Sequence, residues 1–207
     1  MSEKSSNFAA RMEKTTARYE REDLQEAVRV MREGGIILYP TDTVWGIGCD
    51  ATNAAAVERI YRLKQRQDSK AMLCLLDGPG KLQGYVTVPS AAWDLLECQE
   101  GQRPLTIIYP EARNVAPNLI AEDGSLGIRI TAEPFSKALC TMLHHPVVST
   151  SANISGQPAA RSFREIVPEI RDGVDYICRF RRNDPCQAKP SSIVKLGINN
   201  EVTVIRP

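Results

Sequence analysis

The chain has 207 residues, 43% hydrophobic and 25% charged, a composition typical of one globular domain. Its 26 Lys and Arg against 25 Asp and Glu give a formal net charge of +1, which excludes a globally basic nucleic-acid coat protein but not a local basic patch. No apolar run approaches the roughly 20 residues of a membrane helix, and the polar N-terminus does not resemble a signal peptide. The six cysteines form no CxxC pair, so we expect reduced thiols in a cytoplasmic protein without membrane contact.

The first part of the chain predicts a tail, a helix and a strand. We expect residues 1–20 to form a mobile tail and residues 21–207 to form one domain. Apolar residues at helical spacing predict a helix that begins near Asp23 and ends at Gly34. An apolar run at 36–39 then predicts a buried strand, which Pro40 ends.

The rest of the chain alternates strands and helices, though not strictly. A helix is predicted from Asn53 to Lys64, where apolar residues fall on one stripe. Further strands are expected at 72–76, 105–109, 126–130, 146–149, 174–178, 193–196 and 202–205. Further helices are expected at 90–99, 134–143 and 162–171. Because several strands follow one another without a helix between them, we expect an α/β fold with a mixed sheet.

Polar residues follow directly after the first predicted strand. Segment 39–50, YPTDTVWGIGCD, places two hydroxyls, a carboxylate and two glycines where open α/β sheets bind ligands. An ordinary turn at residues 41–43 is the alternative. The match of residues 46–51 to G-x-G-x-x-A does not favour a dinucleotide site, because the strand ends well before the first of these glycines.

Two further segments carry residues that bind anions. Five cations lie within twelve residues: Arg59, Arg62, Lys64, Arg66 and Lys70. They indicate either a clamp for phosphate oxygens or a solvated helix face. Segment 147–158, VVSTSANISGQP, again runs from an apolar strand into hydroxyls and an amide that can donate to phosphate or carboxylate oxygens. There is no Walker A loop, so a nucleotide site would have to be built differently.

Together, YPTDTVWGIGCD, LKQR with Lys70, STSANISG and the closing PSSIV and IRP resemble the YrdC-like family of threonylcarbamoyl-AMP synthases, from about Leu24 to Pro207. The resemblance implies a single-domain, twisted mixed sheet with flanking helices and a concave basic cavity. It implies a nucleotidyltransferase that makes threonylcarbamoyl-AMP and pyrophosphate from L-threonine, bicarbonate and ATP with Mg²⁺. It also implies a downstream threonylcarbamoyl transferase complex that forms threonylcarbamoyladenosine in tRNA.

The resemblance also implies roles for individual residues. The threonine-binding positions would be Thr43, Arg129, Ser149 and Ser191. The ATP-binding positions would be Arg66, Lys70, Ser125, Ser151, Asn153 and Arg206. Lys64 and Arg66 match the K-x-R motif and are expected to be catalytic. The chemistry agrees, because a guanidinium suits the threonine carboxylate and cations are needed to bring two mutually repelling anions together.

The sequence departs from the family at three places. Gln67 replaces a common proline, Ala159 replaces a common hydroxyl residue, and segment 100–106, EGQRPLT, keeps only the Pro-Leu-Thr end of a W-P-G-P-[LV]-T motif. The resemblance implies that these changes affect loop rigidity, one nucleotide contact and the cavity wall.

A paralogue that binds RNA or nucleotide without synthase activity is the alternative function. The retained Asn153, Lys64 and Arg66 favour the enzyme. RNA contact, with tRNA or a double strand, stays open, because the polar loop 179–192 contains four cations: Arg179, Arg181, Arg182 and Lys189. The other interpretation of these four residues is a solvated loop.

Overall fold

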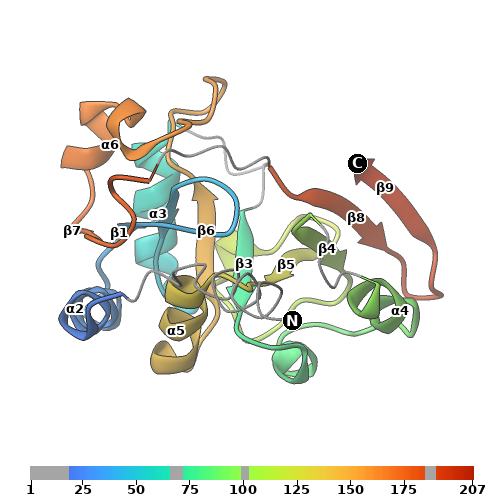
Figure 1. Ribbon diagram of the computed structural model, residues 1–207. Coiled ribbons are helices and arrows are strands. Elements are labelled where there is room, and N and C mark those ends of the chain that lie inside the picture. The colour runs from blue at the N-terminus through green and yellow to red at the C-terminus, as the bar shows by residue number, and fades with distance from the viewer. Residues whose placement is uncertain (1–18, 66–71, 99–102, 185–189) are drawn as a thin grey trace, which may run out of the picture.

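The computed structural model describes residues 19–65, 72–98, 103–184 and 190–207 (Figure 1). Its strands are β1 (Ile37–Tyr39), β2 (Gly46–Gly48), β3 (Leu73–Leu76), β4 (Leu105–Tyr109), β5 (Leu126–Ile130), β6 (Val147–Ser151), β7 (Tyr176–Ile177), β8 (Ser192–Leu196) and β9 (Val202–Arg206). Its α-helices are α2 (Arg21–Arg32), α3 (Ala54–Leu63), α4 (Ala91–Glu97), α5 (Pro134–Leu143) and α6 (Pro168–Asp172). Short 3₁₀ helices occupy Pro79–Gly84, Pro117–Leu119 and Phe163–Glu165.

The nine strands form one mixed sheet in the order β7-β1-β2-β6-β3-β5-β4-β8-β9. Parallel pairs join β1 to β7, β3 to β5 and β4 to β8, and the other neighbours are antiparallel. The predicted single-domain α/β fold with a mixed sheet and flanking helices is therefore confirmed. Strand β9 closes one edge and extends beyond the helices in Figure 1.

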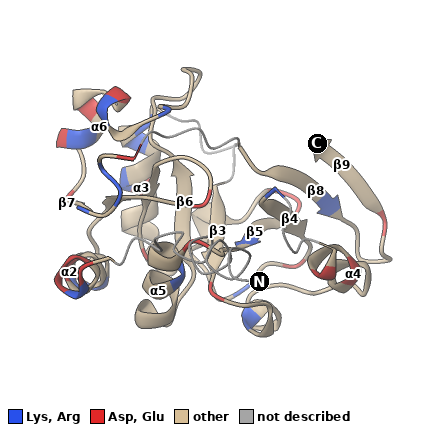
Figure 2. Cartoon of the chain, in the orientation of Figure 1, with Lys and Arg blue, Asp and Glu red and all other residues tan. Residues whose placement is uncertain are grey.

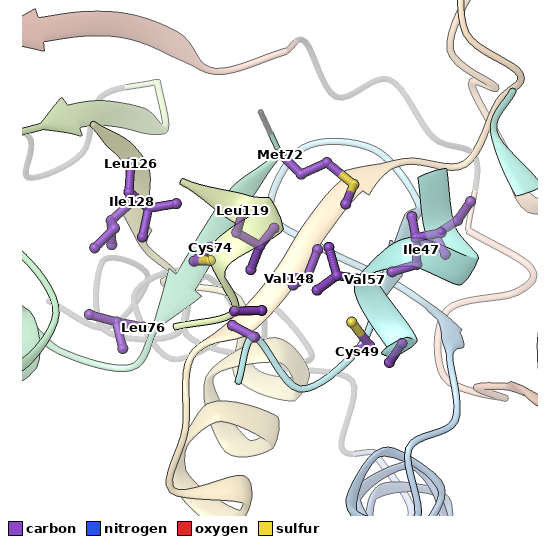
Figure 3. Close-up of a cluster of buried hydrophobic side chains, with 14 of the residues drawn as sticks. Ile47, Cys49, Val57, Met72, Cys74, Leu76, Leu119, Leu126, Ile128 and Val148 are labelled. Atoms are coloured by element: carbon purple, nitrogen blue, oxygen red, sulfur yellow. The ribbon is translucent and has the colours of Figure 1, made fainter. Parts of the chain in front are cut away.

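Alternate residues of the strands supply two separate cores on the two faces of the sheet. Leu38 of β1 belongs to the larger core, in which Val57 of α3 packs against Val148 of β6 (Figure 3). Its neighbours Ile37 and Tyr39 belong to the second core, with buried side chains of α2 and α5. The sheet is thus covered by α3 on one face and by α2 and α5 on the other.

Strand β2 falls in a segment that we expected to be a turn or ligand loop. It pairs with β1 and β6. A Cβ on Gly48 would lie 2.4 Å from the carbonyl oxygen of Val148 and 2.7 Å from the Tyr39 ring. Only glycine allows this close approach, and a run of three residues is too short to show the strand alternation that sequence analysis needs.

Several predicted elements match the structure, and others are wrong. Strands 105–109 and 126–130 and helix 134–143 lie where predicted. The helix expected at 162–171 is instead a 3₁₀ turn followed by α6, because Pro168 forces the preceding residue into an extended conformation. The strand expected at 174–178 is only the two residues of β7.

The predicted tail falls mostly outside the described residues. At its end, the Tyr19 ring packs edge-on against Phe135, with ring centroids 5.6 Å apart, and against Phe180. This part of the predicted tail therefore belongs to the second core.

Two further findings concern the described part of the chain. No helix in it is both long and apolar enough to span a bilayer. The five cysteines that it contains are free: Cys49, Cys74, Cys98, Cys140 and Cys178.

A buried carboxylate joins α2 to the segment after β7. Asp23 is 1% exposed and accepts hydrogen bonds from the backbone N–H groups of Arg179 and Phe180 and from the Tyr176 hydroxyl, at 2.6–2.9 Å. These hydrogen bonds are partly buried, so the carboxylate serves as the acceptor that water would otherwise provide.

We expect Asp23→Ala to lower the free energy of unfolding by about 3 kcal/mol, since it leaves several donors without a partner. Chemical denaturation measures this change. Glu22→Ala is the control, because Glu22 is exposed on the same helix. An equal loss in both variants would show that the Asp23 contacts are not responsible.

Candidate functional site

A cavity of about 470 Å³ lies on the sheet face that carries α2 and α5. These helices pack on β1, β3, β6 and β7, so that the β4, β5 and β8 part of this face remains open. Side chains alternate between the two faces of each strand. Ile107 and Ile128 point into the larger core. Their neighbours Thr106, Gly127 and Arg129 line the cavity on the other face. The absence of a side chain on Gly127 deepens the cavity floor.

Most of the predicted site residues meet in this cavity although they come from separate segments. The lining contains all four predicted threonine-binding residues and four of the six predicted ATP-binding residues: Thr43, Arg129, Ser149, Ser191, Ser125, Ser151, Asn153 and Arg206. The expected ATP-binding residues Arg66 and Lys70 lie outside the described residues, as does Gln67.

The turn after β1 is held by its own hydroxyl groups. Thr41 Oγ1 donates to the carbonyl of Val44 at 2.7 Å and accepts from the backbone N–H of Thr43 at 3.1 Å. The two threonine hydroxyl oxygens are also 3.1 Å apart. Because the Thr41 hydrogen is used on Val44, Thr43 is the donor in this pair. The sequence left Thr41 open as a ligand-site hydroxyl or part of a turn; in the structure its hydroxyl is engaged with Val44 and Thr43.

A buried guanidinium lies on the cavity floor. Arg129 is 3% exposed, and its Nη2 forms an ion pair with Asp42 Oδ1 at 3.2 Å. Its Nε is buried and has no hydrogen-bond partner among the described residues. Burial raises the pKa of the Asp42 carboxyl, and the Arg129 charge acts in the opposite direction. A guanidinium with an unused donor at a cavity wall is suited to a carboxylate ligand.

A second cationic group closes the far side of the cavity. Arg206 Nε donates to the carbonyl of Ser191 at 2.8 Å, and Ser191 Oγ lies 2.9 Å from Thr106 Oγ1. Burial and the charges of Arg103 and Arg129 lower the pKa of Arg206. The described lining residues include two arginines and no carboxylate, so the cavity favours an anion.

Thr106 was not among the predicted site residues. It belongs to the retained Pro-Leu-Thr of segment 100–106, is 2% exposed and lines the cavity through its contact with Ser191. The retained Pro-Leu-Thr sequence is the feature from which Thr106 could have been predicted as a site residue. Ala159 also lines the cavity, at the position where the family often has a hydroxyl.

Ser125 is oriented by an acidic neighbour. Its hydroxyl donates to Asp123 Oδ1 at 2.6 Å, and hydrogen bonds from Lys195 and Ser125 lower the pKa of Asp123 to about 2. The Asp123 carboxylate is therefore ionised at neutral pH and takes the Ser125 hydrogen. Ser125 then offers its oxygen to a ligand as an acceptor.

Asn153 does not offer its amide hydrogens to a ligand, contrary to expectation. Its Nδ2 donates to the carbonyls of Gln157 at 2.7 Å and Ile154 at 3.0 Å, and these two acceptors set the orientation of the amide. Asn153 Oδ1 is buried without a hydrogen-bond partner in the described part of the chain. Asn153 can therefore act toward a ligand only as an acceptor.

Lys64 lies behind the cavity rather than in its lining. It is 1% exposed, and its ammonium donates to the carbonyls of Ser151 and, at 2.7 Å, Asn153. These contacts hold the STSAN segment in place. The geometry thus gives Lys64 a positioning contact where we expected a catalytic cation beside the reacting anions.

Several other cations outside the cavity contact the protein itself. Arg59 pairs with Asp175 and Arg62 with Glu58, on an exposed surface and outside the cavity lining, which agrees with the solvated helix face. Arg182 donates to the carbonyl of Cys178 and stacks over Phe163. Figure 2 shows Lys and Arg interspersed with Asp and Glu on α2 and α6. Lys189 lies outside the described residues.

Comparison with known proteins places these features in context. Residues 29–207 match the Sua5/YciO/YrdC family model, described as "Telomere recombination". Threonylcarbamoyl-AMP synthase of Idiomarina loihiensis is 35% identical over 184 residues, covering 87% of this chain and 96% of that protein. The Stenotrophomonas maltophilia protein of the same name is 38% identical over 158 residues, covering 74% and 84%.

Two solved structures share the fold over most of this chain. Escherichia coli YciO superposes with a TM-score of 0.79 at 26% identity, covering 90% of this chain and 89% of that chain. Sua5 of P. abyssi, solved with L-threonine, superposes with a TM-score of 0.75 at 25% identity. That match covers 86% of this chain but only 52% of the longer Sua5 chain.

We expect Lys64→Met to weaken ATP binding about tenfold, because it keeps most of the side-chain volume but removes the ammonium that holds two carbonyls. Isothermal titration with ATP and Mg²⁺ measures the affinity, and denaturation measures the accompanying loss of stability. Arg62→Met is the matched control, since the Arg62 side chain is 77% exposed. Unchanged ATP affinity in Lys64→Met would contradict the positioning role.

Proposed function

This chain belongs to the Sua5/YciO/YrdC family, and on that premise we propose that it is a threonylcarbamoyl-AMP synthase. The reaction joins L-threonine, bicarbonate and ATP to give threonylcarbamoyl-AMP and pyrophosphate. One observation carries the proposal: eight residues predicted from distant segments line a single cavity that presents two arginines and no described carboxylate. Relatives that match most of their own length bear this name.

In the proposed threonine subsite, Arg129 binds the substrate carboxylate through the guanidinium edge that Asp42 leaves unused. Ser149 is 4% exposed and lies on β6 at the cavity wall. Thr43 and Ser191 provide hydroxyl contacts that recognise the threonine side chain. Such a polar site rejects an analogue without the hydroxyl more strongly than an apolar pocket rejects a small change in size.

In the proposed nucleotide subsite, the acceptors Ser125 and Asn153 meet hydroxyl or amino hydrogens of ATP, whereas Arg206 meets its phosphates. Ser151 lies beside them in the lining. We also assign Arg66 and Lys70 to this subsite, because they match the family's sequence motif. Mg²⁺ is proposed to enter bound to ATP, because the described lining offers hydroxyl and amide oxygens and no carboxylate. Its chemistry there is to offset charge on the departing pyrophosphate.

The proposed chemistry needs no covalent bond to the protein. Threonine nitrogen and bicarbonate first form a carbamate with loss of water. A carbamate oxygen then attacks the α-phosphorus of ATP, and the bond to the bridging oxygen of pyrophosphate breaks. The two anions repel each other, so positioning and electrostatic stabilisation by Arg129, Arg206 and Arg66 carry the catalysis, while Lys64 holds the STSAN segment in place.

The product would be used by a second enzyme. A threonylcarbamoyl transferase complex would consume the mixed anhydride to modify adenosine in tRNA, in the cytoplasm. The alternative, an RNA-binding paralogue without synthase activity, is not favoured by the comparisons with named synthases. Direct RNA contact through the cations of segment 179–192 is a separate hypothesis; among the described ones, the Arg179 side chain is 55% exposed and that of Arg181 28%.

We expect the purified protein to release pyrophosphate from ATP only when threonine and bicarbonate are both present. A coupled phosphate assay measures the release, with serine and valine in place of threonine as controls. Equal release with valine, or with no amino acid, would exclude this function for the chain.

We expect Arg129→Lys to raise the Kd for threonine about tenfold or more, because an ammonium cannot reproduce the two-pronged contact with a carboxylate. Isothermal titration with threonine measures it. Arg161→Lys is the control, since the Arg161 side chain is 83% exposed. Wild-type threonine affinity in Arg129→Lys would remove Arg129 from the subsite.

A further inference from the structure

We propose that Arg181 is a positioning residue for the amino-acid substrate, holding the turn at residues 41–43 in its binding shape from outside the cavity. The inference rests on the proposed function and deepens it. Arg181 does not line the cavity and is one of the four cations that the sequence linked to RNA.

The Arg181 side chain connects its own segment to the turn after β1. Its Nη1 donates to the carbonyl oxygen of Thr41 at 3.1 Å, across 140 residues of sequence. Its Nε donates to Asp184 Oδ2 at 2.7 Å, and the side chain is 28% exposed. Two directed hydrogen bonds on one planar group fix where its remaining donors point.

A buried acid on α5 adds an electrostatic contact. Glu133 caps the helix by accepting the Ser136 N–H through Oε2. Its Oε1 is buried without a hydrogen-bond partner among the described residues, and lies 3.9 Å from Arg181 Nη1. Burial raises the pKa of Glu133, and the Arg181 charge opposes this. Arg181 thus lies between the Thr41 carbonyl, the helix cap and Asp184.

Thr41 connects Arg181 to the proposed threonine subsite. The backbone carbonyl of Thr41 is held by Arg181, and the Thr41 hydroxyl holds both the backbone N–H and the hydroxyl of Thr43. Asp42, between them, pairs with Arg129. A shift of the Thr41 peptide therefore moves Thr43 and the partner of Arg129 together, which are groups of the threonine subsite and not of the nucleotide subsite.

The segment that carries Arg181 is itself firmly held. Asp23 accepts the N–H groups of Arg179 and Phe180, and the Phe180 ring stacks on Phe135 at 5.6 Å. Arg182 donates to the Cys178 carbonyl at 2.7 Å. The guanidinium of Arg181 consequently extends from a fixed base, as a positioning residue requires.

The backbone of Arg181 provides a clean way to test the role. Its φ is +61°, in the left-handed region that a residue with a Cβ occupies at an energetic cost and that glycine occupies readily. Arg181→Gly therefore removes the guanidinium without adding backbone strain.

The experiment measures KM for threonine, KM for ATP and kcat in wild-type protein and Arg181→Gly, with the melting temperature of each. We expect the threonine KM of Arg181→Gly to rise about fivefold to tenfold, consistent with the loss of one charge-assisted hydrogen bond. The ATP KM and kcat should stay within about twofold, and the melting temperature shows whether the variant is still folded at the assay temperature. Arg181→Lys should restore part of the threonine affinity.

Two further variants separate positioning from general support. Arg179→Ala removes a cation of the same segment whose side chain does not contact the turn, and should leave all three kinetic values unchanged. In a Thr43→Val background, Arg181→Gly should have a smaller effect on threonine KM than in wild type, because both act through one group.

Unchanged threonine KM in Arg181→Gly, or an equal rise in both KM values, would overturn the inference while leaving the synthase activity intact. Absence of threonine-dependent turnover in the wild type would overturn both proposals.

Discussion

The buried charge of Arg129 governs the rest of the site. A guanidinium that is almost wholly removed from water must be compensated, and Asp42 supplies an ion pair that leaves Nε unpartnered among the described residues. The carboxylate of a ligand would complete that compensation. Arg129 lies on β5 opposite Leu75 of β3, so the charge is held on an interior strand of the sheet that is paired on both sides. The turn that carries Asp42 must then be held with equal precision.

That requirement explains why so many hydroxyl and amide groups around the cavity are already engaged with the protein. Thr41 holds Thr43, Asp123 takes the Ser125 hydrogen, and the Asn153 amide donates to two carbonyls. Each contact fixes which atom the ligand meets, donor or acceptor, before binding. Preorganised dipoles of this kind cost no reorganisation during reaction. Lys64 and Arg181 act similarly from behind the cavity, each through backbone carbonyls of a site segment.

The cavity exists because one face of the sheet is only partly covered. Helices α2 and α5 cover only part of one face of the sheet, and Gly127 leaves space in the floor. Gly48 lets β2 approach β6 closely, which brings the turn after β1 near the STSAN segment. The hairpin of β8 and β9 then brings Ser191 and Arg206 to the far side. Segments more than 150 residues apart in sequence thus share one anionic ligand site.

The sequence by itself determined the α/β class, most long elements and, through family motifs, eight residues of the cavity, because periodicity and motif spacing are local properties of the chain. It missed β2, the break at Pro168 and the cavity position of Thr106, and it could not show which atoms of Lys64 and Asn153 the protein itself engages. Arg181 could be interpreted only as a cation for RNA contact or as part of a solvated loop. Only the tertiary structure decided these points, because which atom of a side chain remains available depends on partners that are distant in sequence.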